Sequence, residues 1–151
     1  MTDSLTIRLA RLDEREVLER LQWRASLANA GDRDSLLANP DVIRLPPEPI
    51  EAQQVFVAEK GGSLFGFAVL LPSEDGECEL DGLFVDPLAW RGGVGKALVL
   101  HCVMDARCRG ARTISVIGNP HAERFYYACG FKRVGSTETL FGPALVMKLI
   151  V

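Results

Sequence analysis

The spacing of apolar residues along the chain changes period several times, and each change marks the boundary of an expected element. Residues 4–11 alternate between apolar and polar side chains, which is typical of a strand. After them, Asp13 followed three residues later by Glu16 resembles a capping box that begins a helix, and Gly31 is expected to end it. The expected apolar face of this helix consists of Val17, Leu18, Leu21, Ala25 and Ala28.

A second, shorter helix is expected over residues 33–38, because the Asn39-Pro40 pair that follows disfavours helical backbone. The proline-rich segment 41–54 is expected to be a connecting loop. From residue 55 the pattern changes to apolar runs separated by Gly-Gly and Asp-Gly pairs, which are hairpin turns. These runs predict an antiparallel meander of three strands, over residues 55–60, 63–72 and 77–87.

The second half of the chain alternates between expected helices and strands. In order, we expect a helix from the glycine-rich turn at 90–96 to Gly110, a strand over 113–117, a helix from Asn119-Pro120 to Gly130, and strands over 131–136 and 144–150. The strand over 113–117 follows a helix rather than a hairpin turn, so it is expected to run parallel to the strand over 77–87. The predicted class is α+β. We expect a single domain over residues 1–151, with a mixed, twisted sheet of six to seven strands and four helices on both faces.

The composition argues against several classes of protein. With 151 residues, of which 48% are apolar and 25% charged, the chain matches a single globular domain. A formal charge of −3 argues against a nucleic-acid partner. Apolar runs such as 65–71 are far shorter than the roughly 18 to 20 residues that cross a membrane. Asp3 stands where a secretory signal peptide carries basic residues, so we expect a cytoplasmic protein. The four cysteines are expected to be free and buried.

The glycine-rich turn has the composition of an anion site, because it lies between an expected strand and the start of a helix. Unpaired N–H groups and the positive end of the helix dipole meet there, and residues without side chains let a phosphate approach the backbone. The three glycines are Gly92, Gly93 and Gly95. A Walker A loop is excluded because Trp90 and Ala97 occupy its glycine and hydroxyl positions. A dinucleotide-binding fingerprint fits poorly, because Leu98 stands where that motif has its third small residue.

Two motifs and the order of elements carry a family resemblance. The strand end LFVDP, at 83–87, precedes the turn WRGGVGK, in which Gly93 and Gly95 form a Gly-x-Gly pair and Trp90 replaces the usual Gln or Arg. Further along, Asn119 follows a strand, and a helix ends in FYYACGF at 125–131. Over roughly residues 55–135, the chain resembles the GNAT superfamily of N-acetyltransferases.

This resemblance implies transfer of an acetyl group from acetyl-CoA to a primary amine, by direct attack in a ternary complex and without a metal. The parallel strands ending at Val85 and Ile117 are expected to splay apart and form a slot for the coenzyme. The implied coenzyme-binding residues are Leu83, Phe84, Val85, Arg91, Gly92, Gly93, Val94, Gly95, Lys96, Asn119 and Tyr126.

Carboxylates on the strand over 77–87 are the candidates for the base that removes a proton from the amine. Alternation places Glu79 and Asp81 on one side of this strand, and Glu79 occupies the position where several members of the resembled family carry their base. Glu79 is therefore the first candidate and Asp81 the second. The same residues also suit a polar strand face without a catalytic role.

The resemblance also implies an acid and an oxyanion donor. Tyr126 matches the family's acid, which protonates the leaving thiolate, and a backbone N–H of residues 83–85 would donate to the thioester oxygen. The alternative for Tyr126 is a core tyrosine, and for Asn119 a helix cap alone. His101 is expected to be a core histidine.

The acceptor is expected to be an amine on a small molecule or a peptide, with Trp23 and Arg24 bordering its pocket by analogy with the family. The terminal strand is expected either to form the edge of a homodimer or to be buried in the sheet. Two other functions remain open: a non-catalytic module that binds CoA or acetyl-CoA on the same fold, and an interaction domain in which the glycine turn binds nothing.

Overall fold

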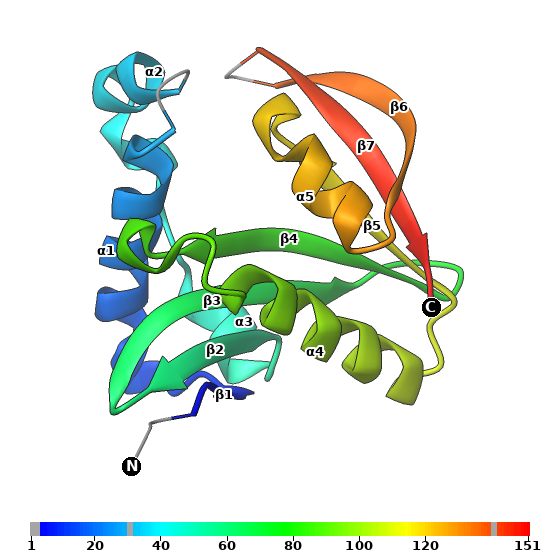
Figure 1. Ribbon diagram of the computed structural model, residues 1–151, viewed down its shortest axis with the longest axis horizontal. Helices are drawn as coiled ribbons and strands as arrows, with labels where there is room; N and C mark the ends of the chain where they lie inside the picture. The colour runs from blue at the N-terminus through cyan, green and yellow to red at the C-terminus, as the bar shows by residue number, and fades with distance from the viewer. Residues whose placement is uncertain (1–3, 30–31, 140–141) are drawn as a thin grey trace. The chain divides into compact units, whose positions relative to one another are not determined.

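The computed structural model describes residues 4–29, 32–139 and 142–151. Seven strands form one mixed sheet in the order β1-β2-β3-β4-β5-β7-β6 (Figure 1), which confirms the α+β class. The strands are β1 (Thr6–Leu9), β2 (Val55–Lys60), β3 (Ser63–Pro72), β4 (Glu77–Val85), β5 (Thr113–Gly118), β6 (Lys132–Thr139) and β7 (Gly142–Ile150). Within the described ranges, the α-helices are α1 (Arg15–Leu27), α2 (Arg33–Ala38), α3 (Pro47–Glu51), α4 (Val94–Cys108) and α5 (Glu123–Ala128).

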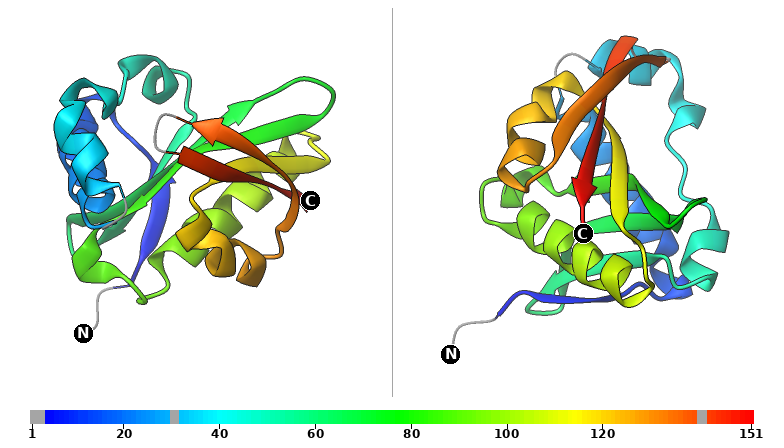
Figure 2. Two further views of the ribbon diagram at one scale, coloured as in Figure 1. Left: turned by 90° about the horizontal axis from the view of Figure 1, so that it is seen from above. Right: turned by 90° about the vertical axis from the view of Figure 1, so that its right-hand side faces the viewer.

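The strand pairing confirms the expected parallel step. β4 and β5 run parallel, with residues 77–80 in register with residues 113–116, while β4 continues to Val85 and β5 to Gly118. The pairs β1–β2, β2–β3, β5–β7 and β6–β7 are antiparallel. β7 therefore has a neighbour on each side and β6 forms the edge of the sheet (Figure 2), so the terminal strand is not the edge that a dimer could extend.

The chain divides into two compact units, and the first comprises Met1–Val69 with Gly82–Leu98. Its core is built from side chains of α1, of the strands β2 and β3, and of the first turn of α4. Buried members include Leu18, Leu21, Val57, Phe67 and Leu98. On α1, the buried residues are Leu18, Leu21 and Ala25. Val17 is 46% exposed and Ala28 is also exposed, so the apolar face of the helix is narrower than expected.

The second unit comprises Leu70–Asp81 with Val99–Val151. Its core lies on one face of β4, β5 and β7, where alternate residues are buried, and it includes side chains of α4 and α5. Buried members include Cys78, Cys102, Ile114, Phe131 and Met147. All four cysteines are free, but only Cys78 and Cys102 are buried, since Cys108 is exposed and Cys129 is half-buried.

The segment 41–54 is not the plain loop that its prolines predicted. It contains α3 and the end of a 3₁₀ turn, Pro40–Val42. Pro47 occupies the first position of α3. A backbone N–H at this position would have no acceptor within the helix, so the N–H that proline lacks is not needed, and the fixed φ of proline is already helical. Ile50 is 5% exposed and anchors this short helix in the core. The prolines therefore begin a helix here rather than prevent one.

The entry to α1 also differs from the expected Asp13–Glu16 box. The Glu14 carboxylate accepts the backbone N–H of Arg11 at 2.8 Å, two residues earlier than predicted. It also accepts the Arg8 guanidinium at 2.8 and 3.0 Å, so a buried acid joins β1 to the start of the helix. The hydrogen bond from Arg8 lowers the pKa of Glu14 despite its burial. Gly31, the expected end of this helix, lies outside the described residues.

We predict that Glu14→Gln lowers the free energy of unfolding at pH 7 by about 1.5 to 3 kcal/mol, the range for a charged hydrogen bond. A carboxylate whose folded pKa is depressed stabilises the fold fully above its ordinary pKa of 4.5, and this contribution is lost as the pH falls through the lower, folded value. Urea unfolding at pH 7 and near pH 3 should show the difference from wild type shrinking in acid.

Asp13→Asn is the matched control, because Asp13 and its ion-pair partner Arg11 are both largely exposed, at 76% and 63% of their side chains. That substitution should cost less than about 1 kcal/mol. Equal losses for the two variants, or a Glu14→Gln loss that is the same at both pH values, would contradict the role given to Glu14.

Candidate active site

The glycine-rich turn connects the end of β4 to the first turn of α4, and it is held by short local bonds. A 3₁₀ turn, Pro87–Ala89, is capped by Asp86, whose carboxylate accepts the Leu88 N–H at 3.0 Å. The Gly92 N–H donates to the Ala89 carbonyl at 3.2 Å. Gly93 has φ of +84°, a conformation that favours glycine. The backbone therefore reverses direction just before the helix begins.

Most amides of this turn are left without a protein acceptor. Among the described residues, the Gly92 amide is the only one between residues 91 and 96 that donates to a protein group. The unused amides are those of Arg91, Gly93, Val94, Gly95 and Lys96. A Cβ built on Gly93 would meet no atom within 4 Å, so no side chain fills the space beside this residue. Unpaired amides at the start of a helix, together with its dipole, make an anion-binding site.

A close contact with β3 sets the position of this helix end. A Cβ built on Gly66 would lie 2.9 Å from the Phe84 carbonyl oxygen, 3.1 Å from Val94 and 3.2 Å from Leu98. The first turn of α4 thus packs directly on the backbone of β3, which a side chain at position 66 would prevent. Sequence analysis missed this role of Gly66, although a lone glycine inside an apolar strand run is a signal of close backbone approach.

Trp90 and Asp86 fasten the turn to its surroundings. Trp90, which stands where the motif has Gln or Arg, donates its indole N–H to the Val85 carbonyl at 2.9 Å and is 46% exposed. Asp86 accepts the Arg24 guanidinium at 3.0 Å, which links the turn to α1. The Asp86 N–H donates to the Phe65 carbonyl at 2.8 Å. The sequence signal for Asp86 was the Asp-Pro pair, which is typical of a cap before a proline.

The candidate bases lie together on β4, in the second unit. Glu77 and Glu79 are half-buried and Asp81 is exposed, while the intervening Cys78 and Leu80 are buried, as the alternation predicted. Burial raises the pKa of Glu79, and the charges of Asp81 and Glu77 raise it further. A raised pKa makes Glu79 a better proton acceptor than an ordinary glutamate.

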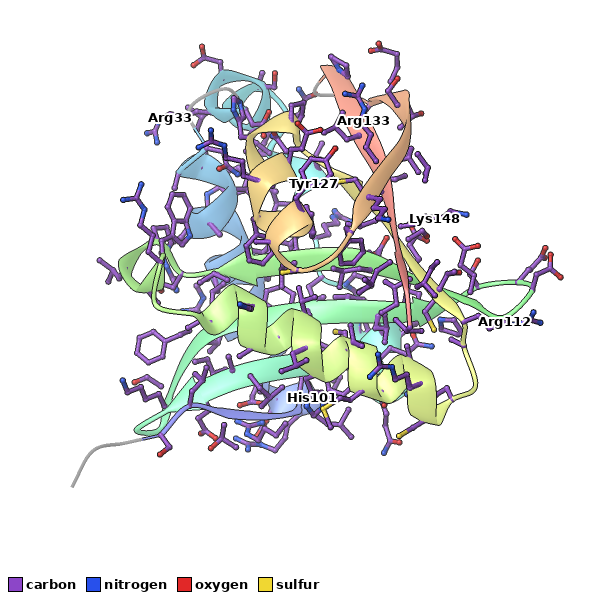
Figure 3. The ribbon with its side chains drawn as sticks, turned by 45° about the vertical axis from the view of Figure 1, so that its right-hand side comes forward. Arg33, His101, Arg112, Tyr127, Arg133 and Lys148 are labelled. Carbon is purple, nitrogen blue, oxygen red and sulfur yellow. The ribbon has the colours of Figure 1, made fainter. Side chains whose placement is uncertain are left out.

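Tyr126 lies on α5 and is 7% exposed. Its ring makes edge contacts with Phe125 and Phe131, at centroid distances of 5.2 and 5.4 Å. Burial raises the pKa of the Tyr126 hydroxyl, so the group stays protonated at neutral pH. Tyr127, the next residue, is 49% exposed (Figure 3). The Asn119 side-chain oxygen Oδ1 accepts the His121 N–H at 2.9 Å, so Asn119 caps the 3₁₀ turn Pro120–Ala122 that precedes α5.

The sheet separates Glu79 from Tyr126. Glu79 is in register with Ser115 on β5, and residues paired across a sheet share a face. Gly118, three residues further along β5, lies on the other face, where its Cβ would come within 3.1 Å of the Tyr126 ring. A proton acceptor and a proton donor are therefore held on opposite faces of β4 and β5.

The candidate residues fall into two groups. The strand end at 83–85 and the turn at 91–96 belong to the first compact unit, and Glu79, Asp81, Asn119 and Tyr126 belong to the second. His101 on α4 is half-buried, so it is not the fully buried core histidine that was expected. In the part of the chain that the structure describes, no group of three or more His, Cys, Asp or Glu could hold a metal ion. No described helix is long and apolar enough to span a membrane.

Comparisons with known proteins identify the family of the chain. Residues 16–131 match the acetyltransferase (GNAT) family. An uncharacterized N-acetyltransferase of Bacillus subtilis strain 168, YvbK, is 33% identical over 102 residues, which cover 64% of this chain and 64% of that protein. The chain therefore belongs to the GNAT family of acetyltransferases.

Solved structures share the fold. The PaiA N-acetyltransferase of Thermoplasma acidophilum, in complex with coenzyme A, superimposes with a TM-score of 0.74 at 19% identity, covering 98% of this chain and 99% of that one. The N-acetylglutamate synthase of Neisseria gonorrhoeae, complexed with coenzyme A and N-acetyl-glutamate, has a TM-score of 0.73 at 20% identity, covering 97% of this chain and 35% of that one. These likenesses confirm the fold.

We predict that Gly118→Ala disturbs the Tyr126 ring, because the added methyl would lie 3.1 Å from Cε2. Overpacking of this kind should lower the free energy of unfolding by about 1 to 3 kcal/mol and shift the Tyr126 ring signals in NMR spectra. Gly135→Ala is the control, since a Cβ there meets no atom within 4 Å. If both variants leave the ring signals unchanged, the close packing of Tyr126 on β5 is wrong.

Proposed function

We propose that this protein is an acetyl-CoA-dependent N-acetyltransferase that moves the acetyl group to a primary amine by direct attack within a ternary complex. The observation that carries the proposal is the row of free amides at the start of α4. A diphosphate is the anion that such a row suits, because its several oxygens can each accept an amide N–H. Arg91 and Lys96, both exposed, add positive charge beside it.

The strand end at 83–85 would bind the arm of the coenzyme. Within the sheet, the pairing between β4 and β5 covers residues 77–80 of β4, and the strand continues beyond that segment. An extended, amide-bearing arm could pair with main-chain groups of Leu83, Phe84 and Val85 as an added strand does. One N–H from this stretch would donate to the thioester oxygen as negative charge develops there. Asn119 and Tyr126 are proposed contacts of the same arm.

Glu79 is the proposed base. An alkyl ammonium with a pKa near 10.4 is neutral in roughly one molecule in 2,500 at pH 7, so its deprotonation costs about 4 to 5 kcal/mol. Glu79 takes this proton, directly or through a water molecule, and the nitrogen lone pair forms the new C–N bond. Asp81 is the second candidate, and its charge already contributes to the raised pKa of Glu79.

Tyr126 is the proposed acid. When the C–S bond breaks, the electron pair remains on sulfur, and the Tyr126 hydroxyl donates its proton or a hydrogen bond to the thiolate. The pKa of a tyrosine hydroxyl already exceeds that of a thiol, and burial raises the pKa of Tyr126 further, so complete transfer is uphill and the hydroxyl acts mainly by stabilising the developing charge. The opposite positions of Glu79 and Tyr126 suit an amine that attacks from one face and a thiolate that leaves toward the other.

We predict that Gly93→Ala weakens binding of CoA at least tenfold in titration calorimetry, because a methyl group would enter the space that the diphosphate needs. Gly62→Ala is a matched control: Gly62 has φ of +81° against +84° for Gly93, and its Cβ also meets no atom within 4 Å. Both changes should cost about 1 to 2 kcal/mol of stability through backbone strain.

Only Gly93→Ala should weaken the binding of CoA. Equal CoA affinity in the two variants would contradict the proposed site, and failure of the wild-type protein to bind CoA below about millimolar concentration would remove the proposal itself.

We predict that Tyr126→Phe and Glu79→Gln each lower kcat about 10²-fold, and that Glu79→Gln leaves the affinity for acetyl-CoA little changed. The measurement is release of the CoA thiol in a screen of aminoglycosides, polyamines, amino acids and peptides. In wild type, kcat/KM should fall in acid as Glu79 becomes protonated, at a pH above that of an ordinary glutamate. Binding of acetyl-CoA with no transfer to any amine would favour the non-catalytic module instead.

A further inference from the structure

Lys148, on β7, reaches across the sheet to only one of the β4 glutamates. Its ammonium group lies 3.2 Å from one Glu77 carboxylate oxygen and 3.4 Å from the other. The backbone register alone does not select Glu77, because Lys148 is in register with Ser115, and Ser115 with Glu79. Lys148 therefore stands in the row of Glu79 but binds its neighbour, and no ion pair among the described residues includes Glu79.

The charges around this row favour a Lys148 side chain that extends toward β4. On the other side of Lys148, Lys132 of β6 is directly in register with it, and like charges opposite each other repel. Lys148 gains most by moving away from Lys132 toward the acidic strand. Figure 3 shows Lys148 extending from β7. Its side chain is 42% exposed and that of Glu77 25% exposed, so the pair is partly screened by solvent.

We propose that Lys148 is a positioning residue for the base: it holds and compensates Glu77, so that Glu79 alone is free to receive the proton of the acceptor ammonium. This inference rests on the proposed function of Glu79. Without Lys148, two uncompensated carboxylates would face the same amine, and each would disfavour ionisation of the other.

The groups that share this face in the second unit are few. On β4 they are Glu77 and Asp81, on β7 Lys148, and on β6 Lys132. β5 contributes Ser115, which does not titrate in this range. With strands about 4.8 Å apart, Lys148 is about 10 Å and Lys132 about 14 Å from Glu79 across the sheet. These are backbone spacings, and the Lys148 ammonium group lies nearer, because it contacts Glu77 on the same face of the same strand as Glu79. Lys148, and not Lys132, is therefore the cation that matters.

The test is an NMR titration of the glutamate side-chain carboxyl carbons in the full chain, with the Glu79 signal assigned by its loss in Glu79→Gln. This readout needs no acceptor. Lys148→Met should raise the midpoint of Glu79 by about 0.2 to 0.7 pH unit, because a compensating cation is removed. Glu77→Gln should lower it, because a like charge is removed and Lys148 is released. Lys148→Arg should restore the wild-type midpoint.

Lys132→Met is the matched control and should move the midpoint by less than about 0.1 pH unit. An unchanged or lowered midpoint in Lys148→Met, or an equal effect of Lys132→Met, would overturn the proposal. These outcomes are separate from the proposed role of Glu79 as the base, which fails if Glu79→Gln retains full acetyl transfer, and from the proposed function, which fails if the wild-type protein does not bind CoA. In the reaction found by the amine screen, the acid limb of kcat/KM should move to higher pH in Lys148→Met.

Discussion

Amide groups at the start of an α-helix have no acceptor within the helix, and the way this chain leaves them open determines what its site can do. Such groups must bond to a cap, to water or to a ligand. The first turn of α4 follows glycines, and five N–H groups between residues 91 and 96 have no acceptor among the described residues. Their dipoles and the exposed charges of Arg91 and Lys96 favour an anion over water.

The rest of the first unit keeps this helix end in place. Gly66 allows the first turn of α4 to lie against the backbone of β3, and the Arg24–Asp86 ion pair ties the turn to α1. Trp90 shows how a departure from the family motif can be accommodated. Its indole bonds to the Val85 carbonyl, so the residue acts on the strand end rather than on the ligand through a charged or amide side chain. The backbone amides, which need no particular side chain, carry the proposed recognition of the diphosphate.

Periodicity predicted most of the fold, because strand and helix patterns depend on local spacing. The helix over 33–38 and the parallel pairing of β4 with β5 are confirmed. The predicted start of α1 was wrong, because the acidic residues at positions 13, 14 and 16 all suit a cap. Only the contact with Arg8 selects Glu14. Contacts between distant positions had no sequence signal: Lys148 and Glu77 are 71 residues apart and meet only through strand register. The same register decides that Glu79 and Tyr126 lie on opposite faces.

The central claim is that main-chain amides before α4 bind the diphosphate of coenzyme A. The most direct measurement is a titration of ¹⁵N-labelled protein with CoA, followed in amide NMR spectra. The account predicts that the largest shifts fall on the amides of residues 91 and 93–96, whereas the Gly92 amide, which already donates to Ala89, and the distant Gly62 move little. Saturable CoA binding that leaves the amides of 91 and 93–96 unmoved would contradict it.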